Sequence, residues 1–123
     1  MKNNGGFSLV ELIVVIAIMA ILAGVAVPTY TKYIKQANDA KVVSQLDEVK
    51  TAGIAAATKA AATVTSIVVA DNADIVVNVT KADGTAGTVA VTDFLDYSKI
   101  DFPSNTTYEG KTATWTSSGW TTN

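Results

Sequence analysis

The sequence predicts an α+β protein in which one long N-terminal helix packs on a small antiparallel β-sheet. Three observations predict this class. Residues 7–27 are almost wholly apolar, small and aliphatic residues then recur every three or four positions to about Ala62, and from Thr63 the chain is rich in Thr and Val with a period near two. Spacings of three and four are typical of one helix face, whereas alternation is typical of a half-buried strand. Outside the apolar stretch, the 123-residue chain is long enough to form one modest core.

The apolar stretch Phe7–Val27 is long enough to span a membrane. A helix of this length covers about 30 Å, which is the thickness of the hydrocarbon core of a bilayer. Its only charged residue is Glu11. Because an unpaired charge inside a membrane helix costs up to about 3 kcal/mol, we expect Glu11 to have a positively charged partner near the start of another copy of this helix.

Gly24 and Pro28 lie one helical turn apart near the end of the apolar stretch. Pro28 has no N–H to donate to the carbonyl of Gly24, so we expect a kink or local melting here. The alternative is that the helix ends at Pro28. The segment from Tyr30 to about Ala62 has a helical pattern of its own, which favours one continuous helix with an amphipathic second half. The expected inner face of that half consists of Val42 or Val43, Leu46, Val49, Gly53, Ala56 and Ala60.

The first half of the predicted sheet contains a strand and a hairpin. The strand covers residues 63–70, and the hairpin pairs residues 75–80 with residues 88–91 across a turn at Asp83-Gly84. We expect one face of the sheet to be buried against the helix and the Thr-rich face to meet water. The expected buried side chains are Val76 or Val77, Val89 or Ala90, and Trp115.

The second half of the predicted sheet is another hairpin. It pairs residues 106–108 with residues 111–116 across Glu109-Gly110. The tail 117–123 is expected to be mobile. Between the hairpins, residues 93–99 are expected to form a short helical turn that brings the apolar pair Phe94 and Leu95 onto the core.

The composition excludes several kinds of catalytic and metal site. The chain contains no Cys and no His, which removes zinc ligation, thiol nucleophiles, disulfides and imidazole acid–base chemistry. The nine basic residues, all lysines, are not clustered, so nucleic-acid binding through bulk charge is not expected. Carboxylates gather at Asp71–Asp74 and at Asp93, Asp96 and Asp101, but the first lacks the spacing and glycine of a calcium loop and the second has no basic partner. We therefore interpret both as solvated surface, and expect no enzyme activity and no cofactor.

The N-terminal residues carry a resemblance to a known family. A polar leader with Lys2, then Gly6-Phe7-Ser8-Leu9-Val10-Glu11 at the head of an apolar helix, resembles the class III signal peptide of bacterial type IV pilins and the related pseudopilins. The resemblance implies that a prepilin peptidase cuts between Gly6 and Phe7 and methylates the new N-terminus at Phe7. We further expect Glu11 to pair, during assembly, with the methylammonium at Phe7 of the same or a neighbouring subunit.

The same resemblance implies a division of the chain into three parts. Residues 1–6 are a leader, residues 7–28 form the membrane-spanning and later filament-core helix, and residues 29–123 form the globular pilin domain. The implied function is a structural subunit of a type IV pilus: a homopolymer that is held in the cytoplasmic membrane with its N-terminus inside and then assembled into a surface filament. Its implied partners are the peptidase and an assembly machine with a cytoplasmic ATPase and an inner-membrane platform.

Three alternatives remain open at this point. A pseudopilin of a type II secretion or competence system has the same signal. An ordinary secretory signal peptide would end in the small residues Gly24-Val25-Ala26 and be discarded, although an acidic residue at the front of the apolar run is unusual for that class. A plain membrane-anchored binding domain would retain Met1.

Overall fold

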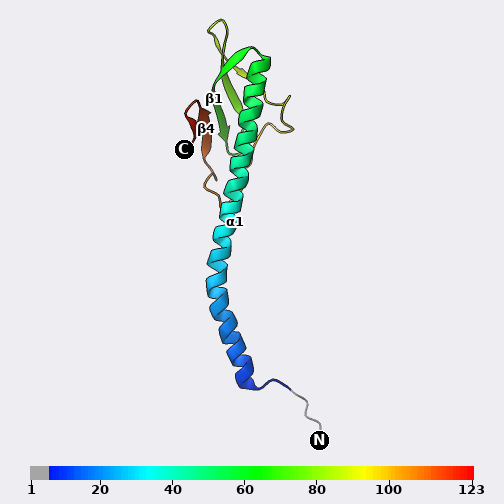
Figure 1. Ribbon diagram of the computed structural model, residues 1–123, viewed down its shortest axis with the longest axis vertical. Coiled ribbons are helices and arrows are strands. Elements are labelled where there is room, and N and C mark those ends of the chain that lie inside the picture. The colour runs from blue at the N-terminus through cyan, green and yellow to red at the C-terminus, as the bar shows by residue number, and fades with distance from the viewer. Residues whose placement is uncertain (1–5) are drawn as a thin grey trace. The chain divides into compact units, whose positions relative to one another are not determined.

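The protein contains one helix followed by five strands, as a computed structural model of residues 6–123 shows (Figure 1). The helix α1 runs from Leu9 to Lys59. The strands are β1 (Ala62–Ala70), β2 (Val76–Lys81), β3 (Ala86–Val89), β4 (Thr112–Thr116) and β5 (Gly119–Thr122). The predicted α+β class is confirmed. The chain divides into two compact units between Ile34 and Lys35, so the N-terminal part of α1 is one unit and the rest of α1 with the sheet is the other.

In the N-terminal unit, α1 continues through Pro28 without a break. Since proline lacks an N–H, the carbonyl of Gly24 loses its helical donor. Two threonine hydroxyls add local bonds here: Thr29 donates to the carbonyl of Val25 at 3.0 Å, and Thr31 donates to the carbonyl of Pro28 at 2.9 Å. The helix therefore does not end at Pro28, and melting of this segment on assembly stays a prediction.

In the C-terminal unit, one stripe of α1 is buried. Most of the predicted inner face is confirmed, and of the two alternatives Val42 and Val43, Val42 is the buried one. The exception is Ala60, which is exposed because it lies beyond the end of the helix. Small residues make up the C-terminal half of the stripe, which allows a sheet to approach the helix axis closely. The buried residues of α1 are Val42, Leu46, Val49, Ala52, Gly53, Ala56 and Ala57.

The sheet is antiparallel, with the strand order β3-β2-β1-β4-β5. Its register aligns one row of side chains across all five strands: Val89, Val77, Ile67, Trp115 and Trp120. Ile67 and Val77, at the centre of the row, are fully buried, and the other three pack against the core at its margins. Of the alternatives left open by the sequence, Val77 and Val89 are the inward members.

The sheet approaches α1 closely at Gly53. A Cβ atom added there would lie 2.9 Å from Cδ1 of Ile67 and 3.2 Å from Cγ2 of Val77. These distances leave no room for a side chain of ordinary size. Gly53 is therefore the point at which the apolar row of the sheet contacts the helix backbone.

The predicted second hairpin is wrong. Residues 106–108 form no strand, and β4 pairs instead with β5, which lies in the tail that was expected to be mobile. The tail is ordered because Trp120 faces Trp115 across the two strands, and because Gly119, with φ of 114°, allows the tight connection after β4. The backbone of the 106–108 segment bonds elsewhere, since the N–H of Thr107 donates to the carboxylate of Asp39 on α1.

Smaller differences concern the strand ends and one loop. β1 and β2 lie within one residue of their predicted bounds, whereas β3 begins two residues earlier than expected because the turn at Gly84 closes tightly, with the N–H of Lys81 donating to the carbonyl of Thr85. In the loop after β3 a single turn forms, in which the N–H of Leu95 donates to the carbonyl of Val91. Leu95 reaches the core as predicted, but Phe94 is 44% exposed, so its predicted burial is wrong.

Candidate functional site

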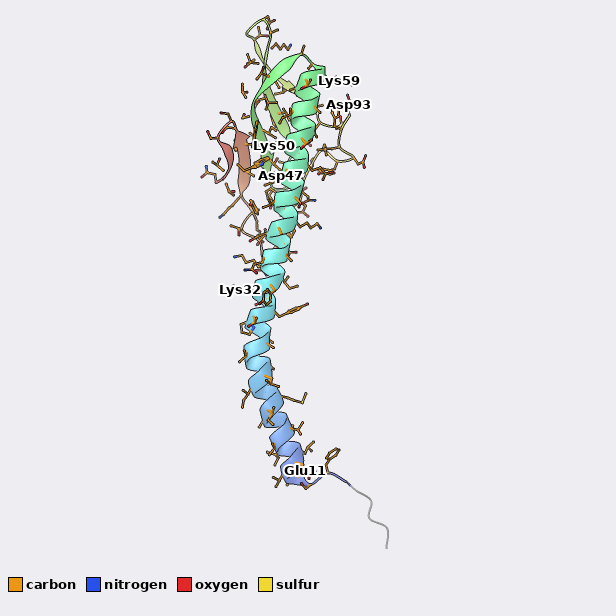
Figure 2. All side chains as sticks on the ribbon, in the orientation of Figure 1. Glu11, Lys32, Asp47, Lys50, Lys59 and Asp93 are labelled. Carbon is orange, nitrogen blue, oxygen red and sulfur yellow. The ribbon has the colours of Figure 1, made fainter. Side chains whose placement is uncertain are left out.

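The first turn of α1 is closed by two reciprocal hydrogen bonds between Ser8 and Glu11. The N–H of Glu11 donates to the hydroxyl of Ser8 at 3.2 Å, and the N–H of Ser8 donates to the carboxylate of Glu11 at 3.4 Å. This arrangement is a capping box, which gives partners to two backbone donors that a helix start otherwise leaves without one. The carboxylate of Glu11 also lies at the positive end of the helix dipole. Figure 2 shows Glu11 at this end of the helix.

The capping box has a signature in the sequence, although it was not among the predicted features. Ser8-Leu9-Val10-Glu11 matches the S-x-x-E pattern immediately before an apolar run. The consequence is that Glu11 has a hydrogen-bond donor within its own chain and is held one turn from the start of the helix. Glu11 still needs a positively charged partner, because a backbone N–H does not neutralise a carboxylate.

The bond between Gly6 and Phe7 lies just before the helix. Both residues are exposed and neither belongs to a helix or strand. No atom lies within 4 Å of the position that a Cβ of Gly6 would occupy. An enzyme can therefore reach this peptide bond without unfolding any of the structure. The rest of the predicted leader, Met1 to Gly5, lies outside the described residues.

The apolar part of the N-terminal unit is fully exposed in a single chain. By length and composition, α1 is the one helix within residues 6–123 that could cross a membrane, and no part of its most apolar window is buried inside the protein. The large aliphatic side chains between Leu9 and Val27 all project into the surroundings. Exposed apolar patches much larger than a few hundred Å² mark protein or membrane contacts. This surface therefore requires lipid or other protein chains around it.

Asp39 joins α1 to the loop before β4. Its carboxylate accepts hydrogen bonds from the N–H of Thr107 at 2.8 Å and from the hydroxyl of Thr107 at 2.7 Å. The backbone N–H of Thr107 contributes most to holding the pKa of Asp39 below its ordinary value, and its hydroxyl and the charge of Lys35 act in the same direction. Because these residues are 68 positions apart, the contact was not predictable from local sequence.

This contact predicts a pH dependence. The lowered pKa of Asp39 in the folded chain means that its contribution is present above the pKa of the unfolded chain, about 3.9, and is lost as the pH falls through the lower folded value. We expect Asp39→Asn to lower the unfolding free energy at pH 7 by about 1 kcal/mol. The unfolding free energy of the variant should also fall less steeply than that of the wild type as the pH is lowered. Urea unfolding of the detergent-solubilised chain, followed by tryptophan fluorescence between pH 2 and 7, measures both effects.

Asp74→Asn is the matched control for this prediction. Asp74 is exposed, and its nearest basic atom, Nζ of Lys99, is 3.9 Å away. We expect its replacement to leave the loss of unfolding free energy at low pH unchanged. An Asp39→Asn chain that keeps the wild-type dependence below pH 4 would show that the contact with Thr107 does not contribute in solution.

Two further carboxylates, Asp71 and Asp93, hold loops in place. The two oxygens of Asp71 accept hydrogen bonds from the N–H of Phe102 at 2.9 Å and from the N–H of Gly110 at 3.1 Å, so this aspartate holds two turns of the long loop together. Asp93 forms an ion pair with Lys59 at 2.8 Å. Among the described residues no group of three or more His, Cys, Asp or Glu side chains is arranged to hold a metal ion.

Comparison with known proteins agrees with the chemistry of the N-terminus. The family described as prokaryotic N-terminal methylation motif matches residues 1–27. The match covers the predicted leader, the Gly6-Phe7 bond, the capping box and the apolar stretch up to Val27. No curated protein and no solved structure gave a significant match.

Proposed function

We propose that this chain, whose residues 1–27 match the prokaryotic N-terminal methylation motif, is a type IV pilin-like prepilin and that its mature form is the structural subunit of a type IV pilus. The observation that carries the proposal is the combination found at the N-terminus. A wholly exposed apolar helix bears a single carboxylate, that carboxylate is held in the first helical turn, and an accessible peptide bond precedes it. The motif points to a structural protein, and it implies processing by a prepilin peptidase.

The processing step that we propose is hydrolysis of the peptide bond between Gly6 and Phe7, which releases residues 1–6 with a new carboxylate at Gly6. Transfer of a methyl group from a cellular methyl donor to the nitrogen of Phe7 follows, with loss of a proton from that nitrogen. Cleavage converts an amide into an ammonium group one residue before Ser8, whose N–H already donates to Glu11. A positive charge is then created next to the carboxylate of the same chain and at the equivalent place in every other copy. This provides the partner that a carboxylate at the head of an apolar helix requires.

Assembly follows from the exposed apolar surface. In the precursor this surface lies in the cytoplasmic membrane, where the signal motif and the helix anchor the chain. Transfer of the helix into a bundle of identical helices replaces lipid by protein at little hydrophobic cost. The contact between copies is heterologous, because the ammonium of one chain and Glu11 of another are different surfaces, and a heterologous contact that does not close generates a helical filament. We place the assembled filament outside the cell.

The N-terminal residue of the mature protein tests this proposal. Mass spectrometry of the protein isolated from producing cells should find N-methyl-Phe7 as the first residue. A chain that begins at Val27 would indicate an ordinary signal peptide, and a chain that retains Met1 would indicate a simple anchor. Either result would exclude the proposed subunit.

Two variants separate the possible cleavage sites. Gly6→Leu should block processing, because the peptidase is expected to need a residue without a side chain before the cleaved bond. The substitution should not disturb the fold, since no atom lies within 4 Å of the position of the new Cβ. Ala26→Leu should leave processing intact, whereas it would block a signal peptidase that needs a small residue before Val27. Processing is measured by the mass of the chain in the membrane fraction.

Recovery from the cell surface distinguishes a pilus subunit from the pseudopilin alternative. A major subunit should dominate the filaments that are sheared from producing cells. A pseudopilin would remain scarce in that fraction even when its N-terminus is processed in the same way.

A further inference from the structure

The C-terminal unit carries an apolar groove beside α1 in which Phe94 is the central side chain. One hollow of about 410 Å³ lies on one side of Phe94 and is lined by Asp47, Glu48 and Ala52 among others. A second hollow of about 320 Å³ also borders Phe94 and is lined by Ala56 and Lys59 among others. The alanine side chains of α1 leave both hollows open. We call these two hollows the Phe94 groove.

The charges along the groove differ from one end to the other. At the second hollow, Lys59 and Asp93 neutralise each other in an ion pair. At the first hollow, Asp47 and Glu48 have no lysine within 4 Å in the part of the chain that the structure describes, and Glu48 accepts a hydrogen bond from the hydroxyl of Tyr97 at 3.2 Å. Figure 2 labels Asp47, Lys59 and Asp93 along this part of the protein. The open end of the groove is therefore apolar with an acidic rim.

Another segment of the same chain has the complementary chemistry. Residues 30–35, Tyr-Thr-Lys-Tyr-Ile-Lys, follow directly after the apolar stretch and are exposed throughout. Tyr30 and Tyr33 are 67% and 65% exposed, and Lys32 and Lys35 are the first positive charges after the leader. We call this segment the basic collar. It combines two aromatic rings with two ammonium groups on two turns of helix.

We propose that the Phe94 groove of one subunit receives the basic collar of a second copy of this chain. The proposal rests on the proposed function, because it requires that copies assemble through their N-terminal helices. Tyr33 would pack beside the ring of Phe94, and Lys32 and Lys35 would face the carboxylates of Asp47 and Glu48.

Three features select this occupant. The opposite charges of collar and rim favour their approach and disfavour like surfaces. The collar is continuous with the apolar stretch that assembly must bury, so it is carried to other copies whenever the helices pack. Each chain also has one collar and one groove, so the contact is heterologous and can repeat along a filament.

Disulfide cross-linking tests the contact directly. The chain has no cysteine, so every disulfide reports on an introduced pair. We expect filaments of the double variant Tyr33→Cys with Phe94→Cys to give, on mild oxidation, a ladder of dimers, trimers and larger species that a reductant dissolves. A disulfide requires Cβ atoms about 4 Å apart, so the ladder would place the two side chains in contact.

The matched control pairs Tyr33→Cys with Val76→Cys. Val76 is also exposed, but it alternates with the inward Val77 and so lies on the opposite face of the sheet. We expect no ladder from this pair. Filaments of the Phe94 pair that give no more cross-linking than the control would overturn the proposal.

Charge reversal provides a second measurement if the cysteine variants fail to assemble. Lys32→Glu with Lys35→Glu should reduce the filament fraction at least tenfold, and the further changes Asp47→Lys and Glu48→Lys should restore at least half of it. Failure of the reciprocal swap to restore filaments would overturn the proposed contact. Failure of the proposed function gives a different result from failure of the contact, because wild-type cells would then yield no filaments at all. That result would overturn both proposals.

Discussion

Replacing Glu11 by alanine should reduce the yield of filaments by at least about 100-fold while the C-terminal unit stays folded. Removal of one partner of a buried ion pair typically costs about 3–5 kcal/mol, and each 1.4 kcal/mol corresponds to about tenfold in an equilibrium constant. In the filament that we propose, the ammonium at Phe7 of each variant subunit would be buried without a counter-charge. Filament yield is measured in the sheared surface fraction, and folding by the fluorescence of the detergent-solubilised chain, since Trp115 and Trp120 both lie in the sheet.

Two further variants separate the charge of Glu11 from its role in the capping box. Glu11→Gln keeps an oxygen that can accept from the N–H of Ser8 but removes the charge, so we expect it to assemble as poorly as the alanine variant. Ser8→Ala keeps the charge and removes one capping bond, which is worth about 1 kcal/mol, and should assemble with a moderate loss. Wild-type filament yield from Glu11→Gln would show that the hydrogen bond, and not the charge, is what assembly needs.

The elements that were predictable from sequence are those whose signal is local. α1 shows an apolar run followed by an extended three-and-four spacing, and such a pattern has few alternatives. β1 and β2 were placed within a residue because Val and Thr alternate and the Asp83-Gly84 turn fixes where the chain reverses. In each case a stretch of about ten residues contains all of the required information.

The elements that were missed depend on contacts between distant residues. β5 has only four residues, and its order comes from the pairing of Trp120 with Trp115 and not from its own alternation. Phe94 and Leu95 are adjacent and both apolar, so no local pattern decides which of them is buried. In the structure Leu95 packs in the core and Phe94 is 44% exposed. In such segments, packing against distant residues outweighs the intrinsic strand propensity of the sequence.

The candidate site was largely accessible from sequence for a different reason. The cleavage and methylation that we propose would depend on a short linear motif, and Gly6, Phe7 and Glu11 lie within six consecutive residues of the sequence. The reciprocal bonds between Ser8 and Glu11 were not predicted, although the S-x-x-E pattern that favours them is equally local. The Phe94 groove was beyond sequence reasoning, since it lies between α1 and a loop more than 30 residues away.

Replacing Gly53 by leucine should lower the unfolding free energy of the C-terminal unit by about 3 kcal/mol. The new side chain would begin 2.9 Å from Cδ1 of Ile67 and 3.2 Å from Cγ2 of Val77, and overpacking of a well-packed core costs about 1–3 kcal/mol or more. The better helix propensity of leucine offsets less than about 1 kcal/mol of this. Urea unfolding of the solubilised chain, followed by tryptophan fluorescence, measures the difference.

Comparison with Gly53→Ala shows whether the size of the new side chain causes the loss of unfolding free energy in Gly53→Leu. Alanine gains about 1 kcal/mol of helix propensity over glycine, and its single methyl group presses mainly on the mobile end of Ile67, so the two effects should nearly cancel. Thr58→Leu, at an exposed position of the same helix, controls for leucine itself and should stay within about 0.5 kcal/mol of the wild type. A Gly53→Leu chain as stable as that control would mean that the sheet and α1 are not in contact at this position, since no relaxation short of separating them makes room for four additional carbon atoms.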